Sequence, residues 1–136
     1  MKRVLLSAAG VAALFGTAIA GSVQPFPVDV DLTAGSAEGD MVTARYAGKE
    51  NEYIGCGIRK FDDGAGGATA FGFCQAEDAD GERGFCNTDN EDLLDAISSS
   101  AAFSFVTFNW DKEGRCTRIG FSNQSLYLPK GLGANL

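Results

Sequence analysis

The sequence contains no histidine. Histidine is the commonest general base, the usual activator of serine and cysteine nucleophiles, and the commonest zinc ligand in proteins. No Gly-x-Ser-x-Gly or Ser-x-x-Lys motif follows residue 20 either, so familiar serine nucleophiles are missing. We therefore expect a protein that is not an enzyme. A carboxylate-dependent hydrolase is the weaker alternative, because a pair of acidic side chains is enough to cleave glycosidic bonds.

The sequence also lacks an apolar run of the roughly 20 residues that a membrane-spanning helix needs. The longest run extends from Val4 to about Ala18; the basic residues Lys2 and Arg3 precede it, and Ala18-Ile19-Ala20 ends it. A basic start, a short apolar stretch and a small-residue ending are typical of a bacterial secretory signal peptide. We expect residues 1–20 to be cleaved and the protein to be exported to the periplasm or the extracellular space, without a transmembrane segment.

Basic residues are scarce, with 11 Lys and Arg against 18 Asp and Glu. Removing the leader takes away Lys2 and Arg3 but no acidic residue, which changes the net charge from −7 to −9. A surface this acidic repels phosphate backbones and anionic lipids. The composition therefore predicts no nucleic-acid partner.

No two cysteines stand in a Cys-x-x-Cys pair, so the four cysteines do not match a zinc site. In an exported chain of this size they indicate two disulfides. A hairpin turning near Gly64 places Cys56 opposite Cys74, while one turning at Asp80-Gly81 places Cys74 opposite Cys86.

Loop-closure entropy gives the nested and the sequential pairing schemes about 7 kcal/mol each. The nested scheme joins Cys74 to Cys86 and Cys56 to Cys116; the sequential scheme joins Cys56 to Cys74 and Cys86 to Cys116. We slightly favour the nested scheme, because it ties early strands to late ones, and place the crossed scheme last.

Alternating apolar residues and turn signals predict strands over 41–47, 52–61, 68–75, 83–86, 102–110 and 115–122. The capping-box pattern from Thr88 to Glu91 precedes Leu93, Leu94 and Ile97 at helical spacing. The expected fold is mainly β, with a minor α+β character. It is a single-domain antiparallel sheet, either a sandwich or a partly closed barrel, with one short helix from about Asp89 to Ser98 and two disulfides.

Four segments follow from these patterns. Residues 1–20 are the predicted signal peptide, and residues 21–40 an N-terminal arm or edge strand whose last residues, from Gly35 to Asp40, have the composition of a linker or turn. Residues 41–130 form the disulfide-stabilised β domain, and residues 131–136 a C-terminal tail.

Acidic residues gather at the tip of the expected second hairpin, at Glu77, Asp78, Asp80 and Glu82. Carboxylate oxygens at alternating positions suit Ca²⁺, although an EF-hand loop needs more ligands than these. Asp-Gly is also the sequence of a tight turn. We keep a weak calcium hypothesis for Asp78, Asp80 and Glu82 and predict no other cofactor.

The chain has 10 phenylalanines and one tryptophan, more than a few short strands must cover. We expect most of them to fill the core and keep an exposed aromatic patch, formed by the rest, as the alternative. Gly55 and Gly57 share one strand face, where either a neighbouring ring or a ligand can approach the backbone. The sequence therefore predicts binding or assembly rather than catalysis, with an unknown protein partner or a second copy of the chain. We keep a calcium-binding exported protein as the alternative.

Overall fold

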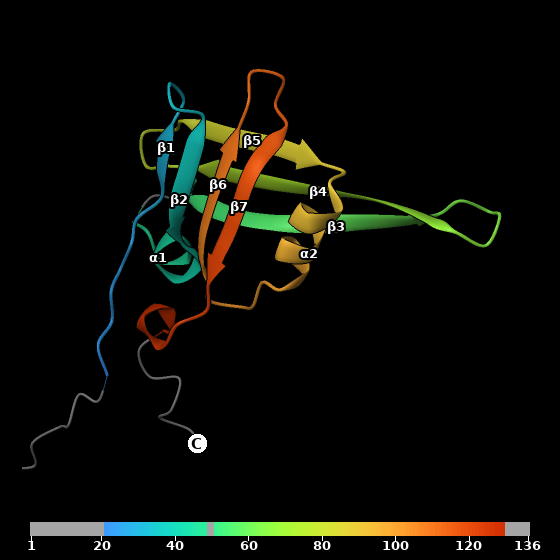
Figure 1. Cartoon of the computed structure of the whole chain (residues 1–136). Coiled ribbons are helices and arrows are strands. Elements are labelled where there is room, and N and C mark those ends of the chain that lie inside the picture. The colour runs from blue at the N-terminus through green and yellow to red at the C-terminus, as the bar shows by residue number, and fades with distance from the viewer. Residues whose placement is uncertain (1–20, 49–50, 130–136) are drawn as a thin grey trace, which may run out of the picture.

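The computed structural model describes residues 21–48 and 51–129. The predicted signal peptide and the predicted C-terminal tail lie outside these ranges. The described residues form seven strands, two helices and one 3₁₀ turn, arranged as in Figure 1. In chain order the elements are β1 (Asp29–Asp31), β2 (Ser36–Asp40), α1 (Met41–Arg45), β3 (Tyr53–Asp62), β4 (Ala68–Glu77), β5 (Arg83–Thr88), α2 (Glu91–Ser98), β6 (Phe105–Trp110), β7 (Cys116–Ser122) and the 3₁₀ turn η1 (Ser125–Tyr127).

The strands form two antiparallel sheets. Sheet A has the order β1-β2-β6-β7, and sheet B has the order β3-β4-β5. The sheets stack with their strands crossing steeply, and the β3–β4 hairpin projects beyond the stack (Figure 1). The mainly β, antiparallel prediction is confirmed. Neither sheet closes into a barrel within the part of the chain that the structure describes.

Glycines on the inner face of sheet B let other elements approach its backbone closely. A Cβ on Gly84 would lie 2.7 Å from the ring of Trp110, which comes from sheet A. A Cβ on Gly72 would lie 2.6 Å from Ile97 of α2. Sheet A therefore covers one part of the inner face and α2 covers another. Fully buried Val106 and Phe108 of β6 complete the core against Cys74 and Cys86.

The strand predicted over 41–47 is wrong, because this segment begins with helix α1. Buried Asp40 is the N-cap, and its carboxylate accepts hydrogen bonds from the backbone N–H of Val42 at 3.0 Å and of Thr43 at 2.8 Å. An acidic N-cap satisfies the free N–H groups of the first helical turn and so starts a helix. The protein thus has a short helix in addition to the predicted one.

The linker predicted at Gly35 to Asp40 is also wrong, because residues 36–40 form β2, which pairs with β1 on one side and β6 on the other. The small size of Gly39 is required there, since a Cβ would lie 2.9 Å from the Cα of Val28. Within residues 21–40, Asp29–Asp31 form β1, which lies at the edge of sheet A.

Both predicted hairpins of sheet B have the expected register. Cys74 lies opposite Cys56 in the β3–β4 pair and opposite Cys86 in the β4–β5 pair. The β4–β5 loop is longer than the two residues predicted, because Glu77 pairs with Arg83 and leaves residues 78–82 in the loop. Helix α2 is confirmed, but its N-cap is Asn90 rather than Thr88.

The structure pairs Cys56 with Cys74 and Cys86 with Cys116, which is the sequential scheme and not the nested one that the sequence slightly favours. Cys56 and Cys86 stand on opposite sides of Cys74 in sheet B, so two strand spacings, roughly 10 Å, separate Cys56 from the strand that Cys116 approaches. Disulfides span Cα distances below about 7 Å. Cys116 therefore reaches Cys86, at a Cα distance of 5.0 Å, and cannot also serve Cys56.

Candidate functional site

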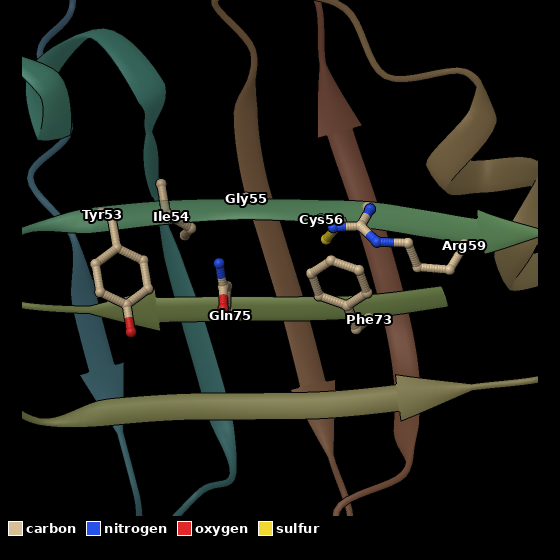
Figure 2. Close-up of a pocket in the computed structure, with 8 residues that line it drawn as sticks. Tyr53, Ile54, Gly55, Cys56, Arg59, Phe73 and Gln75 are labelled. Atoms are coloured by element: carbon tan, nitrogen blue, oxygen red, sulfur yellow. The ribbon is translucent and has the colours of Figure 1, made fainter. Parts of the chain in front are cut away.

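The outer face of sheet B carries a row of aromatic side chains, because residues alternate between the two faces of a strand. We call the side chains of Tyr53, Phe61, Phe71, Phe73 and Phe85 the aromatic face. Phe61, Phe71 and Phe85 are 53%, 41% and 54% exposed, which is unusual for phenylalanine. Figure 2 shows Tyr53 and Phe73 on the side of sheet B that faces away from sheet A. The exposed aromatic patch that the composition left as the alternative therefore lies on one sheet face.

The first depression on this face, which we call the Tyr53 hollow, has a volume of about 390 Å³. Its lining includes Tyr53, Gly55, Arg59, Phe73 and Gln75, several of which are labelled in Figure 2. A Cβ on Gly55 would meet no atom within 4 Å, so this glycine leaves the floor of the hollow open. The hollow exists because one strand position lacks a side chain between two rings.

Gly57 differs from Gly55 in the space around its Cα. A Cβ on Gly57 would lie 2.9 Å from the ring of Phe73, which covers this glycine from the neighbouring strand. The guanidinium of Arg59 lies over the ring of Phe73, 5.0 Å from its centroid, in a cation–π contact. Packing by a neighbouring ring thus explains Gly57, whereas Gly55 stays accessible to a ligand.

The second depression, which we call the Phe85 hollow, has a volume of about 270 Å³. Phe71, Phe85, Asn87, Asp89 and Arg115 contribute to its lining. Phe71 and Phe73 are consecutive outward positions of β4, with ring centroids 6.3 Å apart. Because Phe73 lines one hollow and Phe71 the other, the two hollows are neighbours on one continuous surface.

The carboxylates beside the aromatic face are paired with arginines. Arg83 Nε donates to Glu77 Oε2 at 2.7 Å, and Asn51 Nδ2 donates to Glu77 Oε1 at 3.0 Å. The Asn51 amide, followed by the Arg83 guanidinium, holds the pKa of Glu77 below its ordinary value of 4.5. Arg115 Nη2 likewise donates to Asp89 Oδ1 at 2.6 Å. The face is therefore close to neutral, although the molecule as a whole is acidic.

The residues of the calcium hypothesis have turn functions in the structure. Asp78 is buried, and its Oδ1 accepts from the backbone N–H of Asp80 at 2.9 Å and of Glu82 at 3.0 Å. The calcium site stays a prediction. Its test is a melting-temperature titration with calcium chloride, in which Asp80→Ala should abolish any shift; no shift at millimolar calcium would exclude it.

Among the described residues, the one group of three acidic or sulfur ligands within 4.8 Å of one another consists of Cys74, Cys86 and Cys116. All three sulfurs belong to the disulfides. The two disulfides thus lie in direct contact in the core, beneath the aromatic face.

The sequence indicated part of this surface and missed the rest. The composition offered an exposed aromatic patch without naming its residues, and the glycine pattern singled out Gly55 and Gly57 on one strand face. The sequence did not associate Tyr53, Arg59 and Gln75 with this patch, although the predicted register already places Gly55 opposite Gln75 and Arg59 opposite Phe71. The outward alternation of 53–61 against 71–75 was the available signal.

Comparison with known proteins finds no matching family model, no matching curated protein and no matching solved structure. Neither α1 nor α2, nor any other helix within residues 21–48 and 51–129, has the length and apolar character needed to cross a bilayer.

Proposed function

We propose that this chain is an exported binding module and that the aromatic face of sheet B is its recognition surface. The observation that carries the proposal is the exposure of Phe61, Phe71 and Phe85 on one face, while the opposite face of the same sheet forms the core. Burying a phenylalanine side chain stabilises a protein by about 1.5–3 kcal/mol. The exposed rings do not gain this stabilisation in the free molecule, and they would gain it when a ligand covers them. Such a cluster therefore indicates a binding surface.

The scaffold behind the face is suited to binding because it is rigid. Sheet A and α2 cover the inner face, and Cys86–Cys116 joins β5 to β7 across the two sheets. A preformed surface loses little conformational entropy when a ligand binds. Export, which the leader sequence predicts, agrees with a domain that depends on disulfides.

Binding is favoured over hydrolysis by the state of the acidic groups near the hollows. Glu77 and Asp89 are ion-paired with Arg83 and Arg115, and hydrogen bonds from Asn51 and Arg83 hold the pKa of Glu77 below its ordinary value, whereas a catalytic general acid needs a raised pKa. The polar side chains that line the Tyr53 hollow are a phenol, an amide and a guanidinium, which donate or accept hydrogen bonds.

A variant pair tests the proposal. Phe71→Ser/Phe85→Ser removes two rings from the face, and Tyr46→Ser removes a tyrosine that is 77% exposed after α1, outside the face. The wild type and both variants are immobilised and exposed to the exported fraction. Molecules that bind to the wild type and to Tyr46→Ser should not bind to the double variant. Equal retention by all three proteins, with melting temperatures showing that each is folded, would contradict the proposal.

A further inference from the structure

We propose that the ligand of the aromatic face is a neutral linear polysaccharide, whose sugar rings stack on Tyr53, Phe71 and Phe85. This inference rests on the proposed function, since it names the class of ligand for the same surface. Four features of the face support this inference. Its large apolar side chains are all aromatic, its polar groups both donate and accept hydrogen bonds, it is close to neutral, and it has two neighbouring hollows.

The outward positions of β3, β4 and β5 carry aromatic, polar and glycine residues, and no aliphatic side chain stands among them in these described strands. The inner face of the same sheet uses Ile54 and Ile58, and sheet A meets it with Val106 and Ile119. Sheet faces that pack against protein use such branched residues to interdigitate. A face whose large apolar side chains are all flat rings favours a ligand that is itself flat, such as the C–H face of a pyranose.

The polar groups around the rings suit a hydroxyl-rich ligand. The phenol of Tyr53 and the amide of Gln75 lie in the Tyr53 hollow, and the amide of Asn87 lies in the Phe85 hollow. Each of these groups both donates and accepts hydrogen bonds. Sugars present apolar faces and hydroxyl edges in one ring, so stacking on the phenylalanines leaves the hydroxyls toward these groups.

The charge of the face selects a neutral polymer over a polyanion. Single-stranded nucleic acids also stack on exposed rings, but their binding sites combine these rings with a strongly basic groove. Here Arg83 and Arg115 are paired with carboxylates, and Arg59 lies on the Phe73 ring. The net charge without the leader is −9, which opposes a phosphate chain.

The two hollows indicate a chain rather than a single sugar. They measure about 390 Å³ and 270 Å³ and adjoin along β4, where Phe73 belongs to the first and Phe71 to the second. The Phe71 ring also stacks on Phe61 at 6.0 Å, which extends the row toward the projecting hairpin. A linear polymer lying along this row places successive rings over successive aromatic side chains.

The test measures retention of the purified domain on insoluble β-1,4-glucan and β-1,4-linked N-acetylglucosamine polymer, and its retardation in gels containing soluble xylan or mannan. At least one of these polymers should bind wild type and Tyr46→Ala equally. Tyr53→Ala and Phe71→Ala should each weaken binding about tenfold, as loss of one stacked ring does at other stacking surfaces. Raising the salt from about 50 to about 500 mM should change binding less than twofold, since a neutral ligand is not screened.

Several results would overturn the inference. These are the absence of binding to all four polymers, binding that Tyr53→Ala and Phe71→Ala leave unchanged, or tighter, salt-sensitive binding to oligo-deoxythymidine. A dimer in light scattering that both substitutions dissociate would instead assign the face to a second copy of the chain. If the polymers fail while face-dependent retention from the exported fraction persists, this inference falls and the binding module stands; if both fail, both fall.

Discussion

At the scale of single residues, glycine controls how closely the two sheets approach. Gly84→Ala places a methyl group 2.7 Å from the Trp110 ring, in the buried layer between the sheets, and should lower the free energy of unfolding by about 1–3 kcal/mol. Gly55→Ala is the matched control in the same sheet, because its methyl group meets nothing within 4 Å. This control should be neutral, or stabilise by up to about 1 kcal/mol.

Urea unfolding followed by fluorescence measures both glycine variants, since Trp110 is the single tryptophan and reports on the layer between the sheets. If Gly84→Ala were as stable as Gly55→Ala, the close packing of Trp110 against β5 would be wrong.

Glu77 makes stability depend on pH. Its pKa in the folded protein is below 4.5 because Asn51 and Arg83 hydrogen-bond the carboxylate, so the unfolded chain takes up the proton first. The stabilisation is complete above pH 4.5 and is lost as the pH falls through the folded-state pKa. Wild type should therefore melt higher than Glu77→Gln at neutral pH, and the difference should shrink below pH 4.5.

Melting temperatures of wild type, Glu77→Gln and the exposed control Glu113→Gln between about pH 3 and pH 7 check the Glu77 prediction. A difference between wild type and Glu77→Gln that stays constant over this range would show that the Arg83 pair does not contribute through ionisation.

At the scale of elements, Asp40 links three parts of the chain. It caps α1, ends β2 and accepts from the backbone N–H of Phe26 at 2.7 Å, while only 1% of its surface is exposed. Asp40→Ala should cost about 2–3 kcal/mol, more than the roughly 1 kcal/mol of an ordinary cap, because the half-buried N–H of Phe26 also loses its partner.

Asn90→Ala, which removes the exposed cap of α2, is the comparison for Asp40→Ala and should cost about 1 kcal/mol. Thermal unfolding of both variants by circular dichroism decides the order. Equal losses would mean that the contact with Phe26 adds nothing to the cap.

The elements that the sequence predicted are those whose apolar and polar residues follow the period of a strand or a helix. Strands β3 to β7 alternate, and α2 has a cap and an apolar stripe. Strand β2 was missed because its inward positions, Ala37 and Gly39, are small, and small residues show no apolar alternation. Helix α1 was missed for a related reason: Asp40 belonged to the same Gly-containing stretch and was interpreted as part of a turn.

The candidate site was predictable to a smaller extent. The pattern of β4 places Phe71 and Phe73 on one face, but which face becomes the core depends on where sheet A and α2 pack. That arrangement depends on contacts between residues distant in sequence, such as Trp110 on Gly84. Single-strand periodicity carries no such information.

At the scale of the whole molecule, the two disulfides differ in what they join. Cys56–Cys74 lies within the β3–β4 ladder, whereas Cys86–Cys116 joins sheet B to sheet A. With sequence separations of 18 and 30, the chain-entropy model gives about 3 and about 3.5 kcal/mol. The Cys86→Ser/Cys116→Ser variant should lose more stability than Cys56→Ser/Cys74→Ser. An isolated bridge between Asn87 and Arg115 accompanies the Cys86–Cys116 disulfide, whereas the full β3–β4 ladder accompanies Cys56–Cys74 and holds its strands together without it.

Urea unfolding of the two double-serine variants measures this order. A larger loss from Cys56→Ser/Cys74→Ser would indicate that the hairpin, and not the contact between the sheets, limits stability.

The sequential pairing also determines the covalent skeleton of the protein. Residues 56–74 and 86–116 are two closed rings, and the peptide 75–85 is the single tether between them. Although sulfurs from the two rings lie within 4.8 Å of each other, no covalent bond other than this peptide joins them. A protease cut in the loop 78–82 would therefore release two separate pieces in denaturant, whereas a cut in the loop 63–67 would leave its pieces joined until a reductant opened the first ring.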